Sequence, residues 1–260
     1  MSAAADNAAP AQWILPDWPA PANVRALITT RTGGVSPGPW GSADGGGMNL
    51  GDSCGDTPQN VAANRRRLRE FLPAEPCWLK QVHGTAVVNA QWAAAGVAAD
   101  AAFAIVPAAV CCVLVADCLP VLLTSADGRG VAAAHAGWRG LAGGVLQNAV
   151  TALRTGLADD SAPLLAYLGP AIGPSRFEVG PEVLDAMQQS LPGAASAFTD
   201  HAPGKLRADL FALARQALAQ VGVTQVYGGG LCTMSDPERF YSFRHASPTG
   251  RQAALIWRNE

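Results

Sequence analysis

The feature that most constrains the fold is an apolar stretch that runs from Ala101 to Thr124. Its runs AFAIV and VCCVLVADCLPVLLTS are typical of central strands that are buried on both faces. Pro107, Asp117 and Pro120 interrupt the stretch, so it is a poor candidate for a membrane-spanning helix. The turn sequence DGRG follows and predicts a hairpin to a strand in VAAAHAGWRG. We therefore expect a buried β-sheet at the centre of the molecule.

Helices and further strands flank these runs. Asp56, Thr57 and Pro58 supply a cap and an early proline for a helix that reaches about Phe71. Apolar residues at helical spacing predict helices in GLAGGVLQNAVTALRTGL, PEVLDAMQQSL and RADLFALARQALAQVG. Additional strands are expected in RALITTR, LLAYL, QVYGGGLCT and RQAALIW, and in PCWLKQVHGTAVVNA on both sides of a turn at His83-Gly84.

Length and composition favour one compact unit. With 260 residues, 49% of them apolar and 15% charged, the chain can bury a full core. No repeat or low-complexity linker divides the interior, and no strand-GxGxxG-helix unit supports a dinucleotide-binding fold. We predict a flexible N-terminal tail over residues 1–11 and a single α/β domain with a mixed sheet over residues 12–260.

The net charge and the cysteines indicate which partners and which cellular compartment to expect. The formal net charge is -2 and basic residues are scattered, so nucleic acid is not an expected partner. We interpret the triplet 65–67 as the solvated face of a helix whose apolar side carries Val61 and Leu68. The N-terminus lacks the basic start and apolar run of a secretory signal, which predicts a cytoplasmic protein. The six cysteines form no CxxC pair and are expected to be free.

Two of the four histidines have contexts that suit ligand binding. His83 in QVHG and His135 in HAGWRG lie at expected strand ends beside glycine, where the backbone can approach a ligand closely. Cys118 in ADCLP lies between them and interrupts an apolar strand. Two imidazoles and one thiolate suit zinc, with a fourth position left for water in a catalytic site. The alternatives are a buried histidine with a packed cysteine, or a metal-free catalytic Cys-His pair.

Two reactions place different demands on the surrounding residues. Hydrolytic deamination needs an activated water and an acid-base carboxylate. Asp117 could fill that role or could be a structural strand-end residue, and burial requires a partner for it in either case. Phosphorolysis of a nucleoside needs an anion site instead, for which Arg31, Arg139 and Arg244 are the candidates.

Taken in order, several motifs resemble one family, the YfiH-type proteins, which are also called laccase-domain or polyphenol-oxidase-like proteins. They run from about Thr30 to Trp257 and comprise TRTGGVS, MNLGDSCGD, NVAANRRRL, QVHG, ADCLPVLL, AAHAGWRG, LGPAIGPSRFEVG, DLFALARQAL, CT, FYSFRH and TGRQAALIW. Two positions depart from the family pattern. His245 stands where a second arginine is more frequent, and Cys54 stands where a valine is usual.

The resemblance implies layered sheets packed against helices and a zinc ion, with copper as the alternative metal, held by His83, Cys118 and His135. It implies purine nucleoside phosphorylase activity on adenosine, inosine and methylthioadenosine, together with adenosine deaminase activity. A nucleoside and phosphate are then the expected small-molecule partners of a monomer or weak homodimer that binds neither nucleic acid nor membrane. We assign catalysis to Cys118, Asp117 and Arg31, and substrate or phosphate binding to Asn49, Gln81, Arg139 and Arg244.

Other functions remain as alternatives. Some members of the family are described as peptidoglycan editing factors, so a hydrolase of cell-wall precursors is the second enzyme hypothesis. Copper-dependent phenol oxidation is less favoured, because a multicopper oxidase uses many imidazoles and this chain has four histidines. A structural metal site is also disfavoured, since four protein ligands would normally close it.

Overall fold

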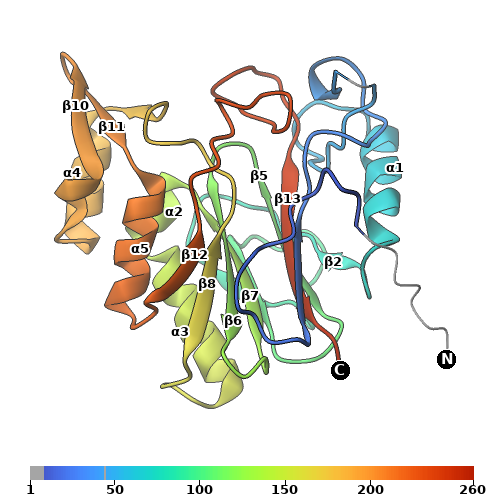
Figure 1. The fold of residues 1–260 in the computed structure, drawn as a ribbon, viewed down its shortest axis with the longest axis horizontal. Coiled ribbons are helices and arrows are strands. Elements are labelled where there is room, and N and C mark those ends of the chain that lie inside the picture. The colour runs from blue at the N-terminus through green and yellow to red at the C-terminus, as the bar shows by residue number, and fades with distance from the viewer. Residues whose placement is uncertain (1–8, 44) are drawn as a thin grey trace.

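The computed structural model describes residues 9–43 and 45–260, which are arranged in four layers (Figure 1). Helix α1 (Pro58–Arg69) covers one outer face and packs on a four-stranded sheet. A six-stranded sheet packs on the other face of that sheet. Helices α2 (Trp138–Gly143), α3 (Val145–Leu157) and α5 (Leu210–Gln220) cover the outer face of the six-stranded sheet. The predicted α/β fold with mixed, layered sheets is confirmed.

Both large sheets are mixed. The first has the order β1-β13-β5-β2, built from β1 (Val24–Ile28), β13 (Gln252–Arg258), β5 (Val110–Val115) and β2 (Pro76–Cys77). The second has the order β12-β8-β6-β7-β4-β3, built from β12 (Gln225–Gly228), β8 (Leu164–Leu168), β6 (Leu119–Ser125), β7 (Val131–Ala136), β4 (Ala101–Ala104) and β3 (Val87–Asn89). The pairs β2-β5, β12-β8 and β3-β4 are parallel, and the other pairs are antiparallel.

The alternation of side chains along β13 explains the stacking of the layers. Ala253 and Leu255 belong to the apolar cluster under α1, whereas Ala254 and Ile256 belong to the cluster between the two sheets. Successive strand residues point to opposite faces, so a strand that is apolar at every position needs cover on both sides. The apolar runs identified in the sequence are therefore inner strands, as expected.

A third apolar cluster joins the six-stranded sheet to its helices. Leu119 and Leu123 of β6 pack there with Leu146 and Leu153 of α3, and all four side chains are fully buried. Burial of each leucine contributes about 2 kcal/mol. This packing fixes β6 and β7 firmly, which matters because both strands carry residues of the site described below.

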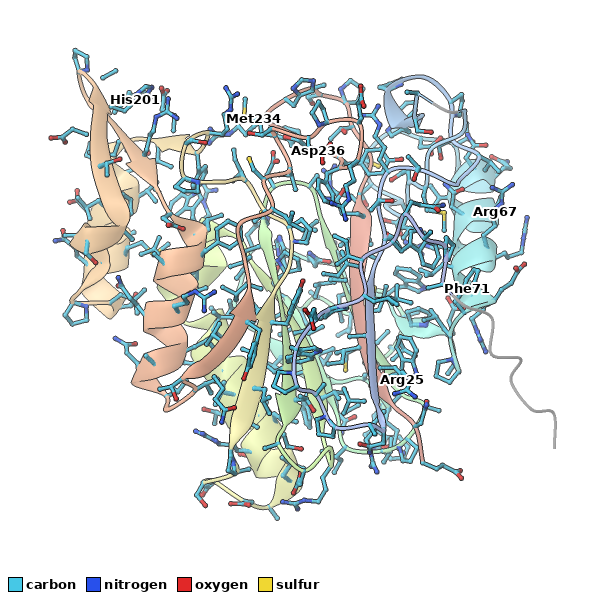
Figure 2. The ribbon with its side chains drawn as sticks, in the orientation of Figure 1. Arg25, Arg67, Phe71, His201, Met234 and Asp236 are labelled. Atoms are coloured by element: carbon cyan, nitrogen blue, oxygen red, sulfur yellow. The ribbon has the colours of Figure 1, made fainter. Side chains whose placement is uncertain are left out.

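A smaller unit at the edge of the fold was not predicted as strands. Strands β9 (Glu178–Val179), β10 (Phe198–Ala202) and β11 (Lys205–Ala208) form a three-stranded sheet beside α4 (Pro181–Ser190). Its hairpin is largely exposed, and Figure 2 shows His201 on β10 at the periphery of the molecule. Because these strands bury little, their sequence lacks the apolar pattern that identifies a core strand. His201 is exposed.

Several boundaries differ from the prediction. The single helix expected after HAGWRG is two helices, α2 and α3, because Gly144 between them has a φ of 94°. The segment PCWLKQVHGTAVVNA contains only the short β2 and β3, with a loop between them. Residues 1–8 of the expected tail lie outside the described residues, while Ala9 packs against the cluster under α1.

Candidate metal centre

The three expected metal ligands lie together at one end of the six-stranded sheet. His135 is near the end of β7, and Cys118 directly precedes β6. The antiparallel register of these strands pairs Pro120 with His135, which brings the two ligands together as the hairpin predicted. His83 reaches them from the loop between β2 and β3. Ligand atoms of the three side chains all lie within 4.8 Å of one another.

A buried carboxylate that sequence reasoning missed holds this arrangement. Asp100 is fully buried, and its side chain accepts hydrogen bonds from the backbone N–H groups of Val82, His83 and Gly84 at 3.2, 2.9 and 2.7 Å. It also lies 2.8 Å from Nδ1 of His135. One carboxylate therefore anchors the His83 loop and the His135 ring at once.

Asp100 also explains why His83 can adopt its backbone conformation. His83 has a φ of 58°, in the left-handed region that residues other than glycine adopt at a cost. Three successive N–H donors converge on one carboxylate and stabilise the tight turn. A signal for this residue was present in the sequence, since Asp100 directly precedes the apolar strand β4. A charged residue at the start of a buried strand requires a partner.

The cluster has a distinct protonation chemistry in the metal-free chain. Burial alone would raise the pKa of the Cys118 thiol, but His135 and His83 outweigh it and lower the pKa to about 6. Burial would lower the pKa of His135, but Cys118 and Asp100 outweigh it and raise the pKa to about 9. A thiolate beside a protonated imidazole is therefore favoured at neutral pH, and the thiolate is the form that binds metals.

The donor set fits zinc. Sγ of Cys118 lies 3.8 Å from Nε2 of His83. A tetrahedral zinc ion with ordinary bond lengths would hold a sulfur and a nitrogen ligand roughly 3.6 Å apart. Nδ1 of His135 is hydrogen-bonded to the Asp100 carboxylate, so Nε2 is the ring nitrogen that remains available to bind a metal. A carboxylate behind a metal-binding histidine fixes its tautomer and ring orientation in this way.

The cluster opens into a cavity of about 840 Å³. Arg139 and Arg244 line it, and each guanidinium lies over an aromatic ring, at 4.4 Å from the Trp138 centroid and 5.3 Å from the Phe177 centroid. The exposed ring of Phe243 also lines the cavity. Two of the three arginines expected to bind phosphate are therefore brought beside the expected metal ligands.

Asp117 lines the same cavity, but its carboxylate is held by other parts of the chain. One oxygen accepts a hydrogen bond from the Thr233 hydroxyl at 2.6 Å, and the other accepts one from the backbone N–H of Arg244 at 2.7 Å. These two donors are the partners that a buried carboxylate at a strand end requires. The arrangement connects Asp117 to the position of Arg244.

The structure does not bring every expected site residue to the cavity. Arg31 is not among the lining residues, and its guanidinium donates to the carbonyl groups of Pro39, Gly41 and Pro237. Asn49 is fully buried away from the cavity. Its amide bonds the residues that organise the 49–56 loop, namely Gly51, Cys54, Asp56 and Arg251.

Gln81 and Arg65 have roles that differ from those expected. Gln81 lines the cavity, but both ends of its amide bond the backbone of Leu114, at 2.7 and 2.8 Å. Arg65 was interpreted as part of a solvated helix face, and this is wrong. Its side chain lines the cavity, lies over the Trp78 ring at 4.1 Å and donates to the Leu50 carbonyl. The spacing of apolar residues along α1 could not show that a neighbouring loop covers this position.

None of the helices in the described part of the chain combines the length and the apolar character that a membrane span requires. Within that part, the His83, Cys118 and His135 group is also the one cluster of three or more such side chains that could hold a metal.

The chain is similar to known proteins along most of its length. Residues 25–259 match the family described as multi-copper polyphenol oxidoreductase laccase. A purine nucleoside phosphorylase of Pseudomonas aeruginosa is 52% identical over 246 residues, which cover 94% of this chain and 98% of that protein. The purine nucleoside phosphorylase YfiH of Escherichia coli is 47% identical over 247 residues, with coverage of 94% and 98%.

Solved structures agree with these similarities. A Neisseria meningitidis protein of the DUF152 family has a TM-score of 0.87 at 47% identity, and the match covers 96% of this chain and 100% of that one. The YlmD protein of Geobacillus stearothermophilus has a TM-score of 0.82 at 31% identity, with coverage of 92% and 93%.

Proposed function

Since the chain belongs to the multi-copper polyphenol oxidoreductase laccase family, with YfiH-type relatives, we propose that it is a purine nucleoside phosphorylase. The observation that carries this proposal is one cavity that combines the His83, Cys118 and His135 cluster with Arg139 and Arg244. A phosphorolytic enzyme must hold an anion beside a nucleoside, and this cavity offers the groups for both.

Arg139 and Arg244 are proposed to bind the attacking phosphate. Each guanidinium lies over an aromatic ring, which restricts its motion. Nη1 of Arg244 donates to the Glu178 carbonyl at 3.0 Å, and the other N–H groups of that guanidinium are proposed to meet the anion. Asp117 is a positioning residue here, because it holds the backbone of Arg244. A phosphate oxygen then forms a bond to C1′ of the ribose as the bond from C1′ to the purine nitrogen breaks. The electron pair leaves with the purine, which takes up a proton, and ribose 1-phosphate is the second product.

The apolar part of the cavity is proposed to bind the purine. Trp138, Phe177 and Phe243 line it together with Ile172 and Leu210. Aromatic and aliphatic side chains exclude water and can stack on a flat base. Adenosine, inosine and methylthioadenosine share the purine ring and ribose, so all three are proposed substrates.

His83, Cys118 and His135 are proposed to hold zinc, with copper as the alternative. When bound, the ion would supply a Lewis acid or an activated water at neutral pH. Activated water is also what adenosine deamination requires, and we propose this as an accompanying activity. Asp117 is not assigned the proton transfer of that reaction, since both its oxygens already accept hydrogen bonds.

Copper oxidation is not proposed for this cavity. Besides His83 and His135, the chain has two histidines, and both are exposed outside the cavity lining. His201 lies on β10 near Glu178, and His245 follows Arg244 in the loop before β13. A blue-copper site and a multinuclear cluster would require more imidazoles than this.

The test is product analysis with purified, zinc-loaded protein. Adenosine is incubated with and without phosphate, and adenine, inosine and ribose 1-phosphate are separated by chromatography. We expect adenine and ribose 1-phosphate only when phosphate is present, and inosine in both reactions. A Cys118→Ala variant is the control for contaminating enzymes. Adenine formation that does not exceed this control would exclude the phosphorylase.

A further inference from the structure

The cavity carries more positive charge than a nucleoside and one phosphate require. Five lysine and arginine side chains line it, against two aspartates. The proposed function uses Arg139 and Arg244, and Asp117 is already bonded to Thr233 and to the backbone of Arg244. The three remaining basic side chains are Arg65, Lys80 and Arg251.

These three side chains reach the cavity from segments other than the helix that carries Arg139, and Arg251 follows Arg244 in the loop before β13. Arg65 lies on α1, Lys80 lies in the loop after β2, and Arg251 is the residue directly before β13. All three elements belong to the α1 side of the fold, whereas Arg139 lies in the first turn of α2 on the opposite side (Figure 1). Gln81 lies between Lys80 and the metal-ligand candidate His83 along the chain, and it lines the same cavity.

Arg65 and Arg251 are held in place by neighbouring parts of the chain. The Arg65 guanidinium lies 4.1 Å from the centroid of the Trp78 ring, and its Nε and Nη2 atoms donate to the Leu50 carbonyl. Arg251 donates from Nη1 to the carbonyls of Thr249 and Gly250, at 3.1 and 2.9 Å. These backbone contacts restrain the two arginines without neutralising their charge.

One acidic side chain offsets only part of this charge. Asp52 lies 3.6 Å from Arg65 and is 71% exposed, so water screens the pair. Among residues 9–43 and 45–260, no carboxylate lies within ion-pair distance of Lys80 or Arg251. Three such cations that line one cavity attract a ligand that carries negative charge of its own.

We propose that Arg65, Lys80 and Arg251 form a second anion subsite, which binds the 5′-phosphate of a purine nucleoside 5′-phosphate. This inference rests on the proposed function for the orientation of the nucleoside. Phosphorolysis places C1′ next to the phosphate on Arg139 and Arg244. The 5′-carbon is attached to C4′, on the other side of the ribose ring oxygen from C1′, so a group on it points away from that phosphate. The other cations that line the cavity are Arg65, Lys80 and Arg251. The cavity therefore accepts nucleotides as well as nucleosides.

The test compares the binding of adenosine and adenosine 5′-monophosphate by calorimetry at low ionic strength. We expect the nucleotide to bind at least about tenfold more tightly, as charge-assisted hydrogen bonds to one phosphate would give. Lys80→Gln and Arg251→Gln should each reduce this ratio. Arg66→Gln is the charge-matched control, because it also removes one positive charge, but Arg66 is exposed and does not line the cavity. Thermal unfolding of each variant checks that it is folded.

Equal affinity of the wild-type protein for the two ligands would overturn the proposal. It would also fail if the ratio persisted in both variants, or if Arg139→Gln alone abolished it, since the 5′-phosphate would then occupy the other site. Binding requires no turnover, so the two proposals fail separately. If the protein binds the nucleotide more tightly but forms no adenine from adenosine, the second anion subsite is supported and the phosphorylase function is excluded.

Discussion

Replacement of Asp100 by asparagine tests how the metal cluster is organised. The carboxylate accepts four hydrogen bonds, with Val82 and Gly84 on one oxygen and His83 and His135 on the other. An asparagine of the same shape turns its NH₂ group toward one of these pairs, so at least two buried donors lose their acceptor. At about 1–3 kcal/mol for each unsatisfied donor, Asp100→Asn should lower the free energy of unfolding by about 2–6 kcal/mol.

The same change should weaken metal binding. With one carboxylate oxygen replaced by NH₂, either the Val82 and Gly84 N–H groups of the turn or the His83 N–H and Nδ1 of His135 lose their acceptor. Loss of a partner behind a metal ligand typically costs 10–100-fold in affinity, and we expect a loss of about that size for zinc. Zinc affinity is measured by competition with a chromogenic chelator, and stability by reversible urea unfolding of the metal-free protein.

The stability effect should depend on pH with a defined sign. Burial would raise the pKa of Asp100, but its bonds to His135 and the backbone outweigh this and lower the pKa below the ordinary value of 3.8. A carboxylate with a lowered pKa in the folded state contributes its full stabilisation at pH values above its pKa in the unfolded chain. This contribution is lost as the pH falls through the pKa of the folded state. The difference between the wild type and Asp100→Asn should therefore be full at pH 7 and should shrink in acid.

A matched control separates this effect from the loss of any carboxylate. Asp127 is half exposed and pairs with Arg129 in the β6-β7 turn, so Asp127→Asn should change stability by less than about 1 kcal/mol and leave zinc affinity unchanged. If Asp100→Asn matched this control in both measurements, Asp100 would not be the organising residue of the cluster.

Four further predictions follow from the geometry. Arg244→Gln should lower kcat/KM for phosphate by roughly 10²-fold while adenosine affinity, measured by calorimetry, changes less, because charge-assisted bonds to the anion are lost. Gly137→Ala should weaken zinc binding in the chelator assay, since the added Cβ would lie 2.9 Å from Cδ2 of His83 and 3.0 Å from Sγ of Cys118. Alkylation of Cys118 by iodoacetamide in the metal-free protein should rise with a midpoint near pH 6, far below the ordinary thiol value of 9.0, and zinc should block it. Gly144→Ala should lower the free energy of unfolding by about 1 kcal/mol in urea titrations, because its φ of 94° strains any residue with a side chain.

Local patterns in the sequence were sufficient for most of the fold. The apolar runs correctly predicted β5, β6 and β7 as inner strands, and the DGRG turn correctly predicted that Cys118 and His135 meet. The start of α1 also followed from its residues, since Thr57 caps the helix and Pro58 opens it. These features depend on neighbours along the chain, which a sequence displays directly.

Contacts between residues that are far apart in the sequence could not be predicted from these local patterns. Arg31 and Asn49 have the residue types of a ligand site, yet neither lines the cavity, because both side chains are hydrogen-bonded to loop segments. Arg65 has the spacing of a solvated position, yet the loop that carries Trp78 covers it. In each case the partner is distant in sequence or lies in a loop without a periodic pattern.

The sequence by itself determined the layered α/β fold and the residue types of the candidate metal ligands. Only the tertiary structure decided that His83 joins the other two ligands through Asp100, and that basic side chains from two sides of the fold share one cavity. The physical reason is that periodicity reports which face of an element is buried. Which partner a polar or charged side chain contacts depends on the distant segment of the chain that packs against it.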